Sequence, residues 1–326
     1  MTTTEPAPKR SAAPVAVGVV FQYANLAEHA GRLGAMTAAA ADAGLDHLAV
    51  GDHVSFSDGG GGDGLVQATA LLASHPTLPV QTAVYLLALR HPATVARQLA
   101  TISQIAPGRL TFGVGVGGDD PRELLLCGVN PRTRGARTTE SLELLKRFMT
   151  GEEVTFAGRF FTVDGSAIRP APDPAIPILV GGRADAALER AGRLGDGWIA
   201  VWVSARRYAE GAELVQRAAD AAGRASPEWR HTLQLWAGFD DSRERAGARI
   251  RPVMETSYSL PFERFERYTP YGRPEHVAAA LQPYLDAGCR RFNFVPVADG
   301  LDAAIESVAA VKRLLVRAVE AAVVGA

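Results

Sequence analysis

The chain has 326 residues, with 34 basic and 35 acidic side chains, a formal net charge of −1 and 47% hydrophobic residues. This composition excludes an intrinsically disordered chain, because enough apolar surface is present to offset the entropy lost on ordering. It also lacks the basic excess with which nucleic-acid-binding proteins neutralise phosphates, so no nucleic-acid partner is expected. No apolar run approaches the ~20 residues of a membrane span, which predicts no membrane partner and a cytoplasmic location.

Residues 1–13 are polar, contain proline and lack the apolar core of a signal peptide, so they are predicted to be a disordered leader. Residues 14–321 are predicted to form a single domain. The two cysteines, Cys127 and Cys289, stand among apolar residues and cannot build a disulfide framework. Neither stands at the spacing of a metal-ligand motif, so buried thiols and no bound metal are expected.

Short apolar runs alternate with amphipathic stretches along the chain. Continuous apolar runs are typical of strands buried on both faces of a sheet, and eight strand-helix units favour an α/β fold of the (β/α)8 TIM-barrel type over an open sheet. The predicted strands are 15–21, 46–50, 79–86, 109–116, 176–180, 198–201, 232–239 and 291–295. The predicted helices are 33–43, 92–105, 138–149, 185–194, 205–222, 242–257, 274–287 and 301–321.

Two stretches do not fit this repeat. Residues 154–163 (VTFAGRFFTV) alternate in polarity around Gly158, which predicts a β-hairpin insertion between helix 4 and strand 5 of the barrel. Residues 51–64 include a run of four glycines at 59–62 and are predicted to form a loop. That loop is either a mobile lid over a site or a disordered linker.

In a barrel of this kind the active site lies at the carboxyl ends of the strands. The second strand is followed by Asp52 and His53, and a histidine can act as an acid, a base or a hydrogen-bond donor near pH 7. The alternative is that the pair only ties down the loop. Small residues follow the third strand at 82–84, where a flat ring could approach the backbone, although they could equally be barrel core.

Glycines follow the fourth and fifth strands. The stretch from Gly113 to Gly118 matches GxGxxG, but it lies on the fourth strand and Asp119 and Asp120 follow it, which disfavours a dinucleotide site. Glycines there more simply open room for a cofactor ring or chain. After the fifth strand, residues 181–183 (GGR) precede a helix whose dipole favours an anion, so this turn is either a phosphate site or only a tight connection.

These motifs together resemble the luciferase-like monooxygenase superfamily, whose members are flavin- or deazaflavin-dependent (β/α)8 barrels. The resemblance spans about residues 14–318 and is closest to the branch of F420-dependent oxidoreductases. It rests on AAAADAGLDHLAVGDH at 38–53, ALRHPATVARQLATISQIAPGRLTFGVGVG at 88–117 and IPILVGGRADAALERAGRLGDGWIA at 176–200.

The resemblance implies a role for individual residues. His53 would be the catalytic acid or base beside the reactive ring, and a cis peptide bond is predicted between Ala83 and Val84, where relatives press a bulge against that ring. The positions that the resemblance assigns to cofactor binding share a place at the ends of strands two to five. They are Asp52, Thr82, Ala83, Val84, Gly115, Val116, Gly117, Val180, Gly181, Gly182 and Arg183.

One departure from the family bears on the substrate. Members that act on sugar phosphates carry a glutamate shortly after the glycines of strand four, where this chain has Gly118 followed by Asp119 and Asp120. Basic residues for a substrate phosphate are also not evident after strand six. A sugar phosphate is therefore not the expected substrate.

The resemblance predicts coenzyme F420 as the cofactor, with FMN as the alternative. The predicted function is an F420-dependent oxidoreductase that transfers a hydride between the deazaflavin ring and a small organic substrate. One alternative is an FMN-dependent monooxygenase that uses reduced flavin and O2 and needs a flavin reductase as partner. The other is a flavin-binding barrel without catalysis. The family resemblance also allows a homodimer.

Overall fold

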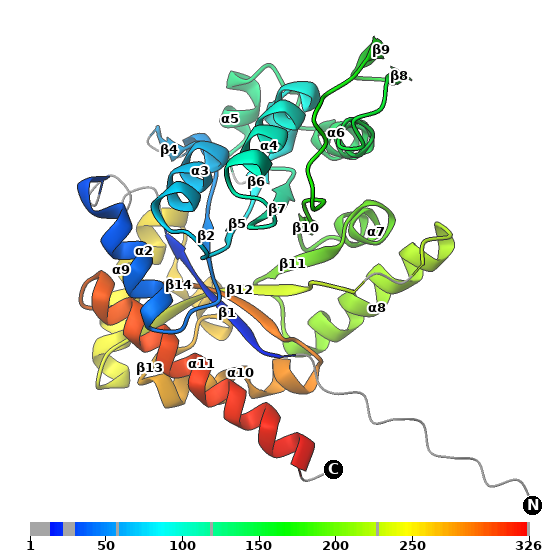
Figure 1. The fold of residues 1–326 in the computed structure, drawn as a ribbon. Helices are drawn as coiled ribbons and strands as arrows, with labels where there is room; N and C mark the ends of the chain where they lie inside the picture. The colour runs from blue at the N-terminus through cyan, green and yellow to red at the C-terminus, as the bar shows by residue number, and fades with distance from the viewer. Residues whose placement is uncertain (1–13, 22–29, 57–58, 118–119, 226–227, 325–326) are drawn as a thin grey trace, which may run out of the picture.

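The computed structural model describes residues 14–21, 30–56, 59–117, 120–225 and 228–324, so the predicted leader 1–13 lies outside the described residues. Within them, eight parallel strands pair in the order β10-β11-β12-β14-β1-β2-β5-β7, and β7 pairs with β10 to close the ring. The chain therefore has the predicted (β/α)8 TIM-barrel fold, with the helices outside the strands (Figure 1). The barrel strands are β1 (Ala16–Phe21), β2 (His47–Val50), β5 (Val80–Thr82), β7 (Leu110–Gly115), β10 (Ile178–Gly181), β11 (Gly197–Val201), β12 (Thr232–Phe239) and β14 (Arg291–Val297).

The helices pack around the barrel and cover the outer faces of the strands. Because each strand is covered on both sides, a short strand such as β2 is buried at all of its residues. The bounds of α4 and α7 are those expected from the sequence, and the other predicted helices differ by a few residues at their ends. The helices are α2 (Leu33–Asp42), α3 (Gly64–Ser74), α4 (Pro92–Ile105), α5 (Pro121–Leu126), α6 (Arg134–Phe148), α7 (Asp185–Leu194), α8 (Ala205–Ala221), α9 (Arg243–Tyr258), α10 (Pro274–Asp286) and α11 (Leu301–Val324).

The predicted third strand, 79–86, is interrupted. Its first part is β5, and the chain then bends away before a short strand, β6 (Tyr85–Leu86), which pairs with the end of β7. The peptide bond between Ala83 and Val84, inside the interruption, is cis. The predicted cis bond is therefore confirmed, and the expectation of one continuous strand is wrong at this point.

The predicted loop 51–64 is also more ordered than expected. His53–Phe56 forms β3, which pairs antiparallel with β4 (Gly60–Gly62). The helix α3 then begins at Gly64, and the carboxylate of Asp63 caps it by accepting the N–H groups of Leu65 and Val66. Residues 57–58 lie outside the described part, but the glycines at 60–62 belong to a two-stranded sheet. The expectation of an irregular linker is therefore wrong for residues 53–56 and 60–62, whereas the role of a lid stays a prediction.

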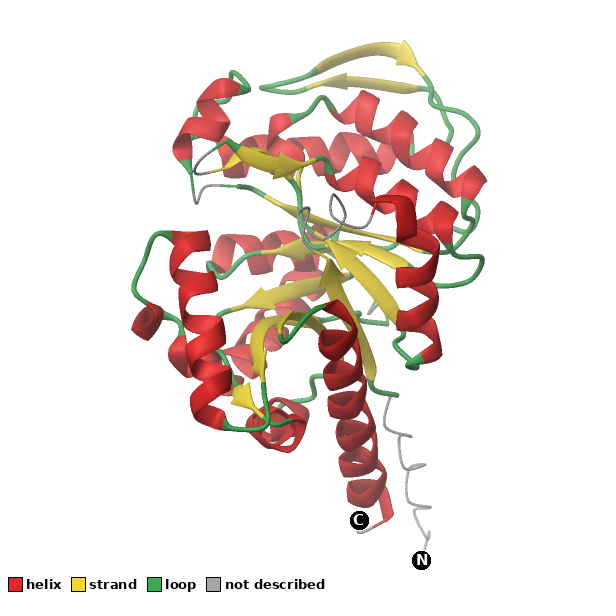
Figure 2. Ribbon diagram, turned by 90° about the vertical axis from the view of Figure 1, so that its left-hand side faces the viewer, coloured by secondary structure: helices red, strands yellow, loops and turns green. Residues whose placement is uncertain are grey.

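A second two-stranded sheet lies between α6 and β10, where the hairpin is predicted. β8 (Val154–Ala157) and β9 (Thr162–Ser166) pair antiparallel, and they stand at the top of the molecule in Figure 2. The carboxylate of Glu140 on α6 accepts the backbone N–H groups of Arg159, Phe160 and Phe161. One side chain of α6 thereby holds the turn of this hairpin.

The remaining elements are short. β13 (Tyr271–Gly272) pairs with the end of β12, and four 3₁₀ turns are η1 (Ala30–Arg32), η2 (Leu87–Leu89), η3 (Phe262–Arg264) and η4 (Glu266–Tyr268). Both cysteines are free; Cys289 is buried, as predicted, whereas Cys127 is only half-buried. Among the described residues, no helix is long and apolar enough to cross a membrane.

Candidate active site at the carboxyl end of the barrel

His53 lies at the carboxyl end of the barrel, because β3 starts three residues after β2 ends. Its side chain is 30% exposed, and its ring packs on that of Phe56 with the centroids 4.4 Å apart. The imidazole is therefore accessible from the rim while one side of the ring is held by an aromatic neighbour.

The imidazole of His53 is paired with Glu123, the third residue of α5. Nδ1 of His53 lies 3.2 Å from Oε2 and 3.3 Å from Oε1 of Glu123. The same carboxylate accepts the backbone N–H of Val54 at 2.6 Å and that of Ser55 at 3.2 Å. We call these two side chains the His53–Glu123 pair. Because an ionised carboxylate can only accept, Nδ1 carries the proton and Nε2 is left for other chemistry.

Glu123 is ionised although it is buried. Only 3% of its side chain is exposed, and this desolvation by itself raises the pKa of the carboxyl. The hydrogen bonds and charge of His53, together with the N–H groups of Ser55 and Val54, outweigh burial and lower the pKa of Glu123 below its ordinary value of 4.5. The site therefore keeps a fixed negative charge behind the imidazole.

Asp52, the neighbour of His53, is buried and fully hydrogen-bonded within the protein. Its Oδ1 accepts the N–H of Gly64 and a guanidinium N–H of Arg90, and its Oδ2 accepts the N–H of Leu86 and a second N–H of Arg90. Four donors leave the Asp52 carboxylate no surface for a ligand. The carboxylate ties β2 to α3 and to β6, and the contact of Asp52 with a cofactor stays a prediction.

The residues around the cis peptide bond form a close-packed bulge. The hydroxyl of Thr82 donates to the carbonyl of Gly113 at 2.7 Å, which joins the end of β5 to β7. The side chain of Val84 fills the space that a Cβ would occupy at two glycines. A Cβ at Gly115 would lie 2.5 Å from Val84 Cγ2, and one at Gly181 would lie 2.8 Å from Val84 Cγ1. These glycines are therefore required by Val84, not only by a bound ring.

Val116 and Gly117 follow β7 and are partly exposed at the rim. Gly117 has φ +70°, a left-handed conformation in which a side chain would be strained. Gly118 and Asp119 lie outside the described residues. The predicted cofactor-lining stretch therefore reaches the rim at residues 116–117, while Gly115 is buried below Val84.

The turn between β10 and α7 has the features of an anion site. Val180 is buried, whereas Gly182 is partly exposed with φ +141°, and a Cβ there would meet that of Ala187 at 2.6 Å. The N-cap of α7, Ala184, provides no side-chain cap, and the carboxylate of Asp185 in the first turn is paired with Arg207. Arg183 is exposed beside it, and its guanidinium lies 5.4 Å from the ring centroid of Trp202.

Glu123 and Arg90 are residues of the candidate site that the sequence did not indicate. The expectation against a sugar phosphate rests in part on the lack of a glutamate at position 118. A glutamate nevertheless reaches the site, from α5, so this part of the expectation is wrong. The signal was present, because Asp120 followed by Pro121 is a typical helix start, with an N-cap aspartate before a proline. Across the described residues, no group of three or more His, Cys, Asp or Glu side chains could hold a metal ion.

The sequence is similar to that of one protein family and to several F420-dependent enzymes. A family model described as luciferase-like monooxygenase matches residues 14–289. An F420-dependent glucose-6-phosphate dehydrogenase from Nakamurella multipartita is 28% identical over 303 residues, which cover 84% of this chain and 89% of the relative. An F420-dependent hydroxymycolic acid dehydrogenase from Mycobacterium tuberculosis is 30% identical over 325 residues, which cover 93% of this chain and 89% of the relative.

Solved structures share the fold at lower identity. A structure of an F420-dependent secondary alcohol dehydrogenase in complex with an F420-acetone adduct superposes with a TM-score of 0.80 at 19% identity, covering 93% of this chain and 99% of the other. This likeness concerns the fold alone. Because the family model covers most of the sequence, the chain belongs to the luciferase-like monooxygenase family.

Proposed function

We propose that this protein is an F420-dependent oxidoreductase that transfers a hydride between the deazaflavin ring and a small organic substrate. The observation that carries the proposal is the His53–Glu123 pair at the carboxyl end of the barrel, with an Nδ1 to Oε2 distance of 3.2 Å. Relatives named F420-dependent dehydrogenases, aligned over most of the chain, support the choice of cofactor.

The residues at the rim are suited to hold such a cofactor. A bound deazaflavin would supply the hydride chemistry, which no side chain provides. The uncapped start of α7, with Gly181, Gly182 and Arg183, suits its phosphate. The bulge that contains Val84, together with Val116 and Gly117, would hold the ring. Gly182 and Gly117 have positive φ angles, a conformation that favours glycine. The absence of a side chain at these two positions leaves room for the cofactor and supports this assignment.

In this proposal His53 accepts or donates the proton that accompanies the hydride. A neutral His53 takes up a proton at Nε2, and the Glu123 carboxylate stabilises the imidazolium that results. In the opposite reaction direction the imidazolium gives up the same proton. Because Glu123 stays ionised and also fixes the backbone at Val54, the ring needs no rearrangement between the two states.

We further propose that the substrate carries no phosphate group. In the segment that follows β11, Arg207 is bound to Asp185 and Arg206 to Glu210. Each of these guanidinium groups already faces a carboxylate, which disfavours a substrate phosphate beside it. Glucose-6-phosphate and a secondary alcohol such as 2-propanol should be compared as electron donors with oxidised F420, and turnover of the sugar phosphate at the higher rate would contradict this part of the proposal.

The cofactor is tested by titrating the purified protein with F420, FMN and FAD and following ligand fluorescence. We expect F420 to bind at least about ten-fold more tightly than FMN, a difference of roughly 1.4 kcal/mol. Retention of FMN through purification without affinity for F420 would contradict the proposal. It would favour the FMN-dependent monooxygenase, for which O2 consumption with reduced FMN and a flavin reductase is the direct assay.

The role of His53 is tested with His53→Ala. Turnover should fall about 10²- to 10⁴-fold, the usual contribution of a general acid or base, while the Kd for F420 changes little. His75→Asn is the matched control, because His75 precedes β5 at the opposite end of the barrel and its side chain accepts the N–H groups of Thr77 and Leu78. Equal turnover of His53→Ala and wild type would remove His53 from the mechanism.

A further inference from the structure

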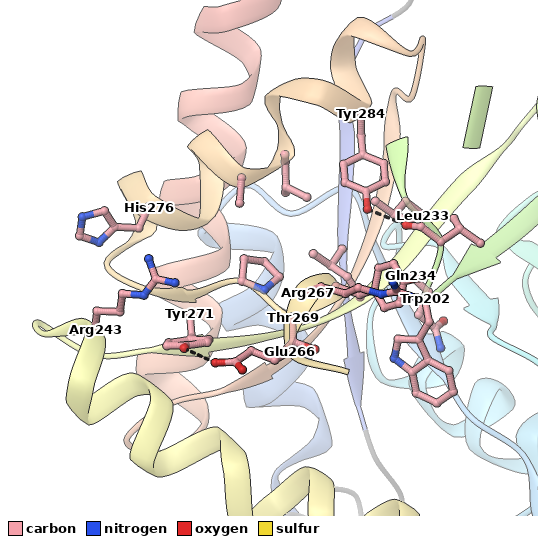
Figure 3. Close-up of a pocket in the computed structure, with 16 residues that line it drawn as sticks. Trp202, Leu233, Gln234, Arg243, Glu266, Arg267, Thr269, Tyr271, His276 and Tyr284 are labelled. Carbon is pink, nitrogen blue, oxygen red and sulfur yellow. Dashed lines mark hydrogen bonds between the residues drawn. The ribbon is translucent and has the colours of Figure 1, made fainter. Parts of the chain in front are cut away.

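A cavity of about 340 Å³ lies between β12, the segment that includes η4, and α10 (Figure 3). This volume is within the range of pockets that hold small molecules. The lining residues do not include His53, Glu123, residues 82–84 or residues 180–183. The cavity therefore does not include these residues of the proposed cofactor site, although it adjoins that site at Trp202, whose ring centroid lies 5.4 Å from the guanidinium of Arg183.

One end of the cavity is apolar and rigid. Leu233 of β12 and Leu281 of α10 line it together with two aromatic residues, Tyr284 and Trp202. The hydroxyl of Tyr284 donates to the carbonyl of Val203 at 2.6 Å, which fixes the phenol. Trp202 has φ +50° and packs against Tyr258 and Phe265 with ring centroids 4.8 and 4.9 Å apart. A ligand at this end would meet flat, preorganised apolar walls.

The same end holds two polar atoms that the protein leaves unsatisfied. Nε1 of Trp202 and Oε1 of Gln234 are buried and have no hydrogen-bond partner among the described residues. Both residues line the cavity, and Figure 3 shows them together at one side of it. A buried donor or acceptor without a partner costs free energy. Both atoms are closed off from solvent, so a molecule bound in the cavity does not reach them.

The cavity wall also carries positive charge. Arg243 stacks on Tyr271 and Arg267 on Tyr268, with the guanidinium carbons 5.0 and 4.5 Å from the ring centroids. Within the described part of the chain, neither guanidinium forms an ion pair with a carboxylate. Glu266, the carboxylate among the lining residues, accepts the hydroxyl of Tyr271 at 2.7 Å. Two cations against one hydrogen-bonded carboxylate favour an anionic ligand.

We propose that this cavity is a second binding site, for an amphipathic organic anion. The aromatic or aliphatic body would lie between Trp202, Leu281 and Tyr284, and the carboxylate would face Arg243. Arg243 and His276 stand at the side of the cavity opposite Trp202 and Gln234 in Figure 3, whereas Arg267 lies on the side of Trp202 and Gln234. The site requires neither F420 nor turnover.

Binding is measured by isothermal titration calorimetry of the full chain with 4-phenylbutyrate, with F420 bound and without it. We expect a saturable one-site isotherm in both cases. The neutral 4-phenylbutyramide should bind about ten-fold more weakly, because it lacks the charge, and inorganic phosphate should not bind at this site, because it lacks the apolar body. Absence of binding of 4-phenylbutyrate at millimolar concentration overturns the proposal, and so does equal affinity for the acid and its amide.

Two pairs of variants locate the binding. Ala280→Trp fills the cavity from the exposed side of α10, whereas Ala279→Trp adds the same side chain at the neighbouring exposed position, which does not line it. We expect at least a ten-fold loss of affinity in Ala280→Trp and none in Ala279→Trp. The double variant Arg243→Gln/Arg267→Gln should bind 4-phenylbutyrate several-fold more weakly. Arg264→Gln, outside the cavity, should bind it as wild type does. If Ala280→Trp binds as tightly as wild type, the ligand is elsewhere and the proposal is wrong.

Discussion

The carboxylate of Glu123 lies 3.2 Å from Nδ1 of His53, although the two residues are 70 positions apart in the chain. It also accepts the N–H of Val54 at 2.6 Å, so one side chain orients both the imidazole and the backbone that carries it. Glu123 of α5 therefore sets the tautomer of His53 and its place at the rim, although His53 itself lies on β3, the strand after β2.

Glu123→Gln tests this relationship. Glutamine keeps an acceptor for the Val54 N–H but removes the charge that stabilises a protonated His53, so kcat should fall about 10- to 100-fold. The solvent deuterium isotope effect on kcat should rise, because proton transfer becomes the slow step. Glu189→Gln, on the exposed surface of α7, is the control. An unchanged isotope effect together with a lower kcat would point to a purely structural role for Glu123.

Asp52→Asn should destabilise the fold. The change leaves the guanidinium of Arg90 without its bidentate partner, which accepts at 2.6 and 2.8 Å and is fully buried. Removing one member of a buried ion pair costs about 3–5 kcal/mol of unfolding free energy. Urea unfolding measures the loss, with Asp42→Asn at an exposed helix end as the control. A loss below about 1 kcal/mol would show that the pair contributes little.

Gly115→Ala should displace the side chain of Val84. The new Cβ would lie 2.5 Å from Val84 Cγ2, and overpacking of this kind costs about 1–3 kcal/mol. Adding Val84→Ala removes the clash and should restore most of the stability. Gly31→Ala, where a Cβ meets nothing within 4 Å, is the control. Thermal unfolding of the single and double variants decides, and the absence of rescue would mean that the clash is not with Val84.

The unfolding free energy should fall as the pH drops from about 6.5 to 4. Burial lowers the pKa of His47 and of His231 from 6.5 to about 4. Between these values the unfolded chain binds protons that the folded protein does not, so stability present above pH 6.5 is lost on acidification, by up to about 3 kcal/mol for each histidine.

The variant His231→Asn isolates one of these contributions. Asparagine can still accept the N–H of Trp198, which His231 accepts through Nδ1 at 3.1 Å, but it does not titrate. Urea unfolding at pH 7.5, 6 and 5 should therefore give a shallower pH dependence in this variant than in wild type. An equally steep dependence in both proteins would assign the acid sensitivity to other groups.

The sequence predicted best those elements whose ends carry local signals. The helix α4 begins where expected because Pro92 suits a first helical position, and the cis bond between Ala83 and Val84 was predicted from the family resemblance. The helix α3 was missed because glycines precede it, although Asp63 is an ordinary N-cap. The His53–Glu123 pair could not be predicted by position, since it exists only when α5 packs beside β3.

The same distinction applies to Asp52. From the sequence it reads as a polar residue at a catalytic rim, and only its four donors in three dimensions show that it is committed within the protein. Likewise, the sequence predicts that Gly115 and Gly181 leave space for a cofactor, whereas Val84, from the bulge between β5 and β6, fills that space.

Arg90 joins the ends of three segments, since its guanidinium binds Asp52 and Asp63 and lies 4.4 Å from the ring centroid of Tyr85. Because Arg90 binds both aspartates, substitutions at these three positions depend on one another. Replacement of either aspartate alone leaves a positive charge with too few acceptors, and replacement of Arg90 leaves two carboxylates close together. Positions 52, 63 and 90 are therefore expected to change as a set among related chains, and a lineage that alters one of them should carry a compensating change at another.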